Sequence, residues 1–347
     1  MNLKRSLFIA VLLGILSVAA WELYWRSQSD YYHIGLEDDR YLWAVHRSKV
    51  EDATSQDIVL LGSSRTGFNF DTHVWKDVQG IKPINLSADG KPPGPMLVDI
   101  VENTNYSGTI VIGITPLMWF GSSDNQRWRD ANKWVEHYHN QTYAQKLGHW
   151  VSKPLQRNLI MLTSSELEFY NDLDLKSLVN RIEFKSERPG NNFKLYNFSY
   201  IDVDRNINMF PSMVSNPSFA KKIQDAWNSF LPTLPEHEMV KDGIPDIMQQ
   251  YMPTLTKFKE RGGKLIFIRH KAEPGWNMHS ERMLPRAQTW DVFIEMVDCP
   301  GYHWEDYEFM SKYTLPDWSH MNAKDAKSYT RDMVNELLKN NHLQKAN

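Results

Sequence analysis

Short apolar runs bounded by glycine, proline or aspartate recur along the chain, at IVLL (58–61), INL (84–86), TIVIGI (109–114) and KLIFI (264–268). Their apolarity is continuous rather than alternating, which predicts strands buried on both faces of a sheet. Helix-like segments separate them, for example at 93–106 and 246–263. Strands that alternate with helices indicate a doubly wound parallel sheet, so we expect an α/β fold.

The N-terminal segment, residues 1–27, has a different pattern. An uncharged run from 6 to 21 follows Lys4 and Arg5, and aromatic residues flank its end. The run suits the core of a signal peptide, with small residues at 18–20 for cleavage. Together with the flanking aromatic residues it is long enough for an uncleaved anchor, which we favour. Because the positive flank stays in the cytoplasm, we expect a single-pass inner-membrane protein whose remaining chain is periplasmic, or secreted after cleavage.

Residues 28–347 are expected to form the α/β domain, but the segment 120–250 does not keep the strand and helix rhythm. We interpret 120–250 as a helical insertion that caps the carboxyl edge of the sheet. The alternative is an ordinary helical layer with no role in binding. The last helix is clearer, since apolar residues recur three and four apart after the suitable N-cap Asn322. His320 therefore lies in the loop just before a helix.

Composition narrows the function classes. A chain of 347 residues can bury a full core, and its net charge of −3 is spread without a long basic run. No polyanion-binding surface is indicated, so we expect no nucleic-acid partner. The single cysteine, Cys299, excludes an internal disulfide framework and a multi-cysteine zinc site. No cofactor is implied.

A polar stretch, Gly62, Ser63, Ser64 and Arg65, follows the first predicted strand directly. Open α/β sheets bind ligands at the carboxyl ends of their strands, so a serine here is placed to attack a substrate. A serine-rich surface turn is the plainer alternative. A phosphate-binding loop is disfavoured, because its glycine spacing and its lysine are missing.

Two further stretches carry candidate chemistry. In LPDWSHMNAKDA (315–326), Asp317 and His320 are three residues apart. The carboxylate can orient the imidazole, which is the base that a serine nucleophile needs. The alternatives are a surface loop or two metal ligands, although the local sequence has no third ligand. In INLSADG (84–90), the backbone N–H of Gly90 can approach an oxyanion, unless this glycine only forms a turn.

These three stretches, in this order, resemble the SGNH (GDSL-like) hydrolase superfamily. LLGSSR resembles its first block, with Ser63 in place of the usual aspartate and Ser64 matching the nucleophile. NLSADG resembles the second block, which implies that Gly90 and the Ser64 amide form an oxyanion hole. DWSH resembles the final block, which implies that Asp317 and His320 complete a triad. The resemblance covers about 57–120 and 260–340 and implies a flavodoxin-like sheet.

The third block departs from this pattern. It normally ends a strand with Gly-x-Asn, whose asparagine donates to the oxyanion, but here Gly113 is followed by Thr115. Either the Thr115 hydroxyl donates instead, or the hole has two backbone donors. Losing one such donor costs about 10² to 10³ in rate. Basic residues next to the predicted strand ends, Arg65, Arg269 and His270, are candidates for binding an anionic substrate group. For Arg65 a structural ion pair is the alternative, and for His270 a satisfied loop histidine.

The serine in place of aspartate, the N-terminal segment and the insertion resemble the membrane-anchored branch of the superfamily. That branch includes the D-alanyl transfer protein of teichoic acids and the O-acetyltransferases of alginate and peptidoglycan. The resemblance implies serine-dependent acyl-ester chemistry on an envelope polysaccharide, as esterase or O-acyltransferase, with an integral membrane acyl donor as a possible partner. The alternative is a catalytically inactive protein that uses this fold to bind glycan or to scaffold an envelope assembly.

Overall fold

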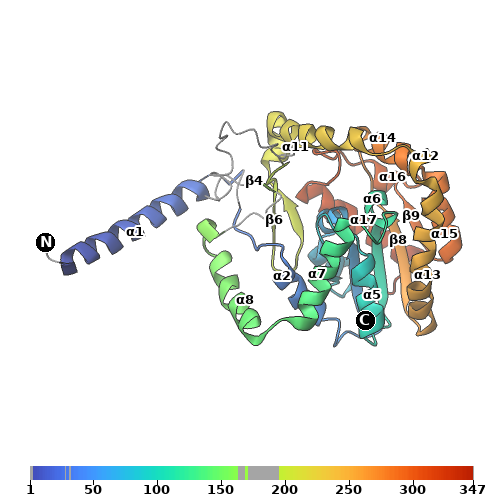
Figure 1. Cartoon of the computed structure of the whole chain (residues 1–347), viewed down its shortest axis with the longest axis horizontal. Helices are drawn as coiled ribbons and strands as arrows, with labels where there is room; N and C mark the ends of the chain where they lie inside the picture. Colours follow the sequence, from blue (N-terminus) through green and yellow to red (C-terminus); the bar gives the residue numbers. More distant parts are fainter. Residues whose placement is uncertain (1–2, 28, 31–32, 163–168, 171–194, 347) are drawn as a thin grey trace.

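A central parallel sheet organises the chain. The structure is a computed structural model that describes residues 3–27, 29–30, 33–162, 169–170 and 195–346 (Figure 1). Five parallel strands pair in the order β2-β1-β3-β8-β9. Their bounds are β1 Ile58–Gly62, β2 Ile84–Asn85, β3 Thr109–Ile114, β8 Lys264–Arg269 and β9 Gly301–His303. The expected α/β fold with a parallel sheet is confirmed. The edge strand β9 was not predicted, because its three residues are too short to form an apolar run.

Both faces of the sheet are buried, which explains the continuous apolar runs. On β1, Val59 and Leu61 pack into one core while Ile58 and Leu60 pack into the other. Side chains alternate across a strand, so a sheet covered on both faces needs apolar residues at every position. The first core includes residues of α2 Arg40–Ser48, α5 Gly94–Asn103, α7 Gln126–Asn140, α13 Ile244–Glu260 and α15 Trp290–Val297. The second includes residues of α4 Thr72–Gln79, α16 Glu308–Ser311 and α17 Ala323–Lys339.

The expected insertion, 120–250, does not form one cap. Helices α7 and α13 belong to the main core, as the alternative interpretation held, through residues such as Trp134 and Met248. Residues 195–234 instead adjoin the carboxyl edge of the sheet and pack into two smaller apolar clusters, one with Phe68 and one with Trp276. This part contains β5 Leu195–Tyr196, β6 Ser199–Ile201, β7 Ile207–Met209, α10 Ser212–Ser215, α11 Pro217–Phe230 and η2 Leu231–Thr233. Residues 163–168 and 171–194 of the expected insertion lie outside the described residues.

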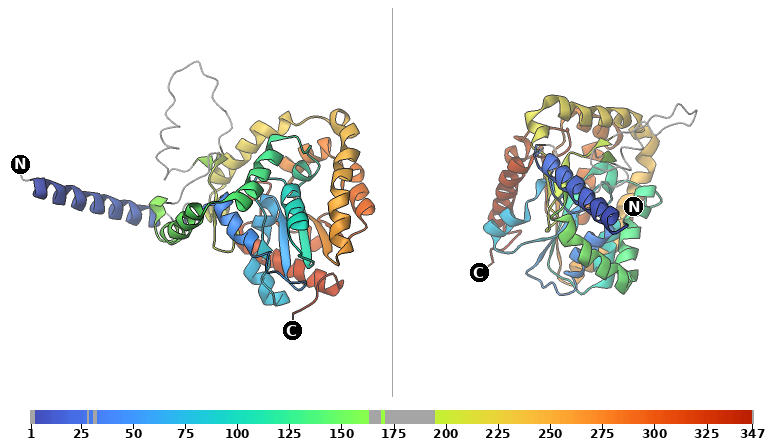
Figure 2. Two further views of the ribbon diagram at one scale, coloured as in Figure 1. Left: turned by 60° about the horizontal axis from the view of Figure 1, so that its bottom comes forward. Right: turned by 90° about the vertical axis from the view of Figure 1, so that its left-hand side faces the viewer.

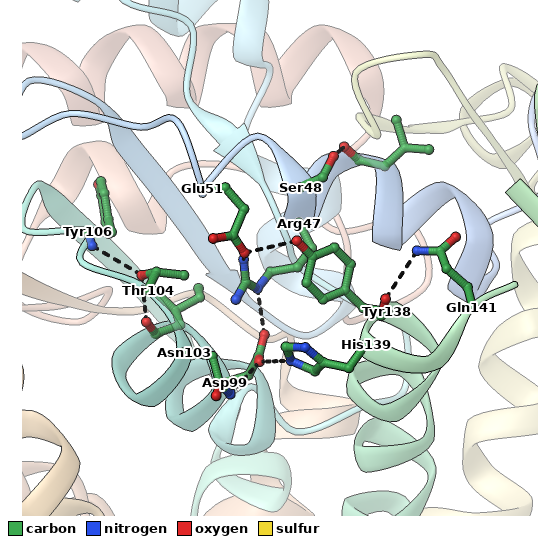
Figure 3. A network of polar contacts seen from close by, with 12 residues as sticks. Arg47, Ser48, Glu51, Asp99, Asn103, Thr104, Tyr106, Tyr138, His139 and Gln141 are labelled. Atoms are coloured by element: carbon green, nitrogen blue, oxygen red, sulfur yellow. Dashed lines mark hydrogen bonds and ion pairs between the residues drawn. The ribbon is translucent and has the colours of Figure 1, made fainter. Parts of the chain in front are cut away.

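Other short elements connect these layers. They are α3 Ser64–Asn69, α6 Pro116–Trp119, α8 Tyr143–Gln156, η1 Ile160–Leu162, β4 Phe169–Tyr170, α12 His237–Val240, η3 Lys241–Gly243, α14 Pro274–Met283 and η4 Arg286–Gln288. The helices α2, α5 and α7 are tied together by a buried polar network (Figure 3). Arg47 Nε donates to Asp99 Oδ2 at 2.5 Å, and His139 Nε2 lies 2.6 Å from Asp99 Oδ1. Arg47 and Asp99 are both fully buried. Each compensates the charge of the other, which would destabilise the fold if it were buried without a partner.

The helix α1 Leu3–Arg26 projects from the rest of the molecule (Figures 1 and 2). Its mean hydropathy reaches 2.1 and its side chains are mostly exposed, so it is long and apolar enough to cross a membrane. The expected N-terminal apolar helix is therefore present. By length and composition it fits either a membrane span or a signal sequence.

Candidate active site

The carboxyl end of β1 leads directly into α3. Gly62 is the last residue of β1 and pairs in register with Gly113 of β3. A Cβ at Gly62 would lie 1.9 Å from Thr66 Oγ1, and one at Gly113 would lie 1.8 Å from it. The two glycines thus leave the space that the first turn of α3 occupies. This close approach places Ser64, the first residue of α3, at the edge of the sheet.

Ser64, His320 and Asp317 form a continuous hydrogen-bonded chain. Ser64 Oγ lies 2.8 Å from His320 Nε2, and His320 Nδ1 lies 2.6 Å from Asp317 Oδ2. When Nδ1–H donates a hydrogen bond to the carboxylate, the imidazole presents its Nε2 lone pair to the serine hydroxyl. This is the arrangement that activates a serine as a nucleophile.

Asp317 is held as a buried carboxylate. Its side chain is fully enclosed, and Oδ1 accepts the backbone N–H groups of Ser319 and His320 at 3.1 and 2.7 Å. Burial acts to raise the pKa of Asp317, but the charge and hydrogen bonds of His320 and the Ser319 N–H outweigh it and lower the pKa. Trp318, between Asp317 and Ser319, adopts a φ of 71°, a left-handed conformation that is uncommon for a bulky residue. This turn aims both N–H groups at the carboxylate.

Aromatic rings hold the imidazole in place. The ring of Phe68, four residues after Ser64 on α3, lies 4.3 Å from that of His320 between centroids. Phe198 stacks on Phe68 at 5.7 Å and lies 5.9 Å from His320. The imidazole is therefore packed on one side by α3 and by the segment that adjoins the carboxyl edge of the sheet.

Gly90 and Thr115, the expected oxyanion donors, line the same pocket as Ser64 and His320. Gly90 has a φ of 64°, and its carbonyl accepts a hydrogen bond from Arg127 Nη1 at 3.1 Å. Thr115 is buried at the start of α6, and its side chain makes no capping hydrogen bond there. Both residues thus border the pocket that Ser64 and His320 also line.

The pocket has a volume of about 560 Å³ and is mainly apolar. Its walls come from the ends of β1 and β3, from the loop before α17, and from residues 195–234. From residues 195–234 the lining side chains are Leu195, Phe198, Trp227, Phe230 and Leu234. An enclosed apolar wall next to a hydrogen-bonded serine suits a substrate whose reacting group is shielded from water.

Arg65 lies in the pocket wall and is fully buried. Its Nε donates to Ser319 Oγ at 3.0 Å, and its guanidinium carbon lies 5.2 Å from the centroid of the Trp276 ring. Nη1 and Nη2 are buried without a hydrogen-bond partner. Burial lowers the pKa of Arg65 strongly, the charge of Arg269 lowers it further, and Asp317 opposes them. The alternative of a structural ion pair is not found, because no carboxylate of the described residues lies within ion-pair distance of Arg65.

Arg269 and His270 are not brought to this pocket. They are fully buried and are absent from its described lining. Arg269 Nη1 donates to the His270 carbonyl at 2.7 Å, and His270 Nδ1 lies 3.0 Å from Tyr329 Oη. The expectation that they contact substrate is therefore not supported. The guanidinium of Arg269, the last residue of β8, is held by the His270 carbonyl and Asn277, whereas His270 is held by Tyr329 of α17.

Three residues of the site were missed by sequence reasoning. Ser319 holds Arg65 and donates its N–H to Asp317, Phe68 packs on His320, and Trp276 lies beside the Arg65 guanidinium. Phe68 was detectable, because a helix beginning at Ser64 places position 68 on the same face. Ser319 and Trp276 had no such signal, since their partners are distant in the chain.

The described residues contain no group of three or more histidine, cysteine or acidic side chains arranged to hold a metal ion. The pocket instead holds Ser64, His320 and the buried Arg65, together with further polar residues such as Asp89 and Arg127. Comparisons with known proteins add no identity: no family model matches the chain, and no curated protein matches it in sequence.

Proposed function

We propose that this protein performs acyl-ester chemistry through Ser64. The observation that carries the proposal is the hydrogen-bonded chain from Ser64 Oγ through His320 to Asp317. Ser64 Oγ attacks the acyl carbon while His320 Nε2 takes its proton. The proton then passes to the departing alcohol oxygen, and the ester bond to that oxygen breaks. Water or a sugar hydroxyl then gives a proton to His320 and attacks the acyl carbon of the acyl-enzyme. The ester bond to Ser64 Oγ breaks, and the serine takes the proton back from His320.

The stabilisation of the oxyanion is assigned to the Ser64 and Gly90 amides, with the Thr115 hydroxyl as a third donor. The position of all three residues on one pocket supports this assignment. Donors fixed before the reaction lower the energy of a tetrahedral intermediate without reorganising during it. Asp317 acts by orienting His320 and by stabilising the imidazolium that forms.

We further propose membership of the SGNH superfamily. The strand order β2-β1-β3-β8-β9 corresponds to the flavodoxin-like order, and Ser64 follows β1, next to the switch point between β1 and β3. The three motifs that carry the resemblance converge on one pocket. With α1 as an uncleaved anchor, the domain would face the periplasm, and the acceptor would be an envelope polysaccharide supplied with acyl groups by an integral membrane protein.

The nucleophile is tested with a fluorophosphonate probe on the full chain in detergent. The wild type is expected to be labelled, and Ser64→Ala to lose the label. Ser63→Ala is the matched control and is expected to keep it, because Ser63 makes no capping bond with its side chain. Equal labelling of wild type and Ser64→Ala would mean that Ser64 is not the nucleophile. No labelling and no turnover of folded wild type would favour a glycan-binding or scaffold role.

The acceptor is tested separately. A p-nitrophenyl acyl ester is supplied with and without oligosaccharides of uronic acids or amino sugars, and the products are examined by mass spectrometry. An acyl group on the sugar identifies a transferase. Release of the free acid at the same rate with and without sugar identifies an esterase.

A further inference from the structure

Helix α8 carries its apolar side chains on its exposed face. The spacing of these residues is four, three, one and four, which places them on one side of a helix. Their exposed fractions run from 46% to 81%, and none of the residues of α8 is buried. They are Tyr143, Leu147, Trp150, Val151 and Leu155. A water-exposed stripe of this kind marks an interaction surface.

The opposite face of α8 is polar and faces the protein. His149 stacks on Tyr41 with ring centroids 5.9 Å apart, and Gln156 Oε1 accepts the backbone N–H of Glu37 at 3.5 Å. Gln145, His149 and Gln156 are half-buried, while the apolar residues between them are exposed. This is the reverse of the usual arrangement of a surface helix. The helix therefore presents apolar side chains to something outside this domain.

The apolar helix α1 ends beside α8. Glu22 Oε2 accepts the backbone N–H of Ile160 at 3.0 Å, and Arg26 Nη2 donates to the Asn158 carbonyl at 2.7 Å. Asn158 and Ile160 follow α8 by only a few residues. Figures 1 and 2 show α1 leaving the body of the protein next to the C-terminal end of α8. A membrane crossed by α1 would therefore have its surface close to α8.

The charge of α8 fits an anionic lipid surface. Lys146, Lys153 and Arg157 are its charged residues, and no acidic residue occurs between 143 and 157. Lys146 and Lys153 line an open groove of about 840 Å³ between α8, α2 and α7, together with Tyr143, Leu147 and Trp150 of the apolar stripe. Basic side chains close to a membrane surface are attracted by its anionic headgroups. Tryptophan and tyrosine are the residues enriched at the level of the headgroups.

We propose that α8 is a membrane-interface helix, lying in the headgroup layer of the bilayer that α1 crosses, with Leu147, Trp150 and Val151 in the acyl boundary. Its length of about 21 Å is sufficient for such a helix. A bilayer is favoured over a second protein chain because the helix combines apolar, aromatic and basic residues and adjoins the end of α1. The domain would then be attached to the membrane at two points, α1 and α8, which fixes the side of the domain that faces the lipid. This attachment does not depend on the chemistry at Ser64.

The test measures lipid contact at one position of the full chain. Val151→Cys is compared with Val292→Cys on α15, because the two valines are 47% and 42% exposed. The native Cys299 is replaced by serine, and each new thiol carries an NBD fluorophore. The proteins are reconstituted in vesicles of phosphatidylethanolamine and phosphatidylglycerol with or without doxyl-labelled lipid. Doxyl lipid is expected to remove most of the fluorescence at 151 and little of that at 292.

Aqueous iodide completes the experiment and is expected to quench position 292 and spare 151. Quenching of both positions by iodide and of neither by doxyl lipid would overturn the proposal, since α8 would then be in water. Protection of position 151 from both quenchers would also overturn the proposal, because the exposed face of α8 would then be covered by protein rather than by lipid. Leu155→Cys, on the same face, serves as a second probe if Val151→Cys does not fold.

Discussion

Ser64 Oγ and His320 Nε2 lie 2.8 Å apart although 256 residues separate them in the chain. The contact joins the first turn of α3 to the loop before α17. Asn69 at the end of α3 accepts the N–H of Met321 at 3.3 Å, so the two segments are also tied beside the reacting groups. The geometry of the triad is thus set by the packing of α3 against the last helix.

Asp317→Asn is expected to lower kcat by about 10⁴-fold on an activated ester, since the amide cannot hold the imidazole in the reactive tautomer. The substitution keeps the size of the side chain, so labelling should slow while the melting temperature changes little. Stopped-flow measurement of probe labelling and of ester hydrolysis checks this. A variant with near wild-type rates would remove Asp317 from the mechanism.

Thr115→Val tests the third oxyanion donor, because it keeps the shape of the side chain and removes the hydroxyl. A decrease in kcat of about 10² to 10³ with little change in KM is expected. Thr115→Ser is the matched control and should keep most of the activity. If valine and serine behave alike, the hole consists of backbone donors alone.

Arg65→Met separates substrate binding from stability. The guanidinium has two buried nitrogens without partners, so replacing it with an apolar side chain should leave the free energy of unfolding unchanged or raised. The KM for an anionic glycan ester should rise, whereas that for a neutral ester should stay near the wild-type value. Urea denaturation and parallel kinetics measure the two effects. A loss of stability of more than about 2 kcal/mol would mean that Arg65 is structural.

The burial of His270 leads us to expect that the folded protein loses stability in acid. Burial, together with the charges of Arg65 and Arg269, lowers the pKa of His270 to about 3. The unfolded chain, with a histidine pKa near its ordinary value of about 6.5, therefore binds the proton first as the pH falls. Stability is fully present above that value and declines below it, by about 2 kcal/mol at pH 5.

The matched variant is His270→Gln, which removes the titrating group and is expected to flatten this decline. Urea denaturation at pH 7 and pH 5 measures both proteins. The same loss in wild type and variant would show that other groups account for the acid sensitivity.

Gly113→Ala should disrupt the start of α3, because its Cβ would lie 1.8 Å from Thr66 Oγ1. We expect a loss of at least about 2 kcal/mol and of probe labelling at Ser64. Thr66→Ala removes the clashing hydroxyl and should restore part of both in the double variant. Additive losses in the double-mutant cycle would show that the two sites are not coupled.

The sequence by itself determined the main layers and much of the candidate site. Apolar runs such as 58–61 and 109–114 predicted buried strands because a doubly covered sheet requires apolar residues at every position. Ser64 and His320 were placed at a strand end and before a helix by local signals, namely the glycine after the apolar run and the N-cap Asn322. Such signals act over a few residues and can be read locally.

The tertiary structure decided which side chains reach the pocket. Arg65 and Arg269 both lie by strand ends and are both fully buried, yet only Arg65 lines the pocket. The difference lies in partners that are distant from Arg65 in the chain, such as Ser319 and Trp276. The short strand β9 likewise forms by pairing with β8, without an apolar pattern of its own. The apolar residues of α8 recur at helical spacing, but periodicity cannot tell which face meets the protein. That depends on contacts made across the fold, which local pattern does not encode.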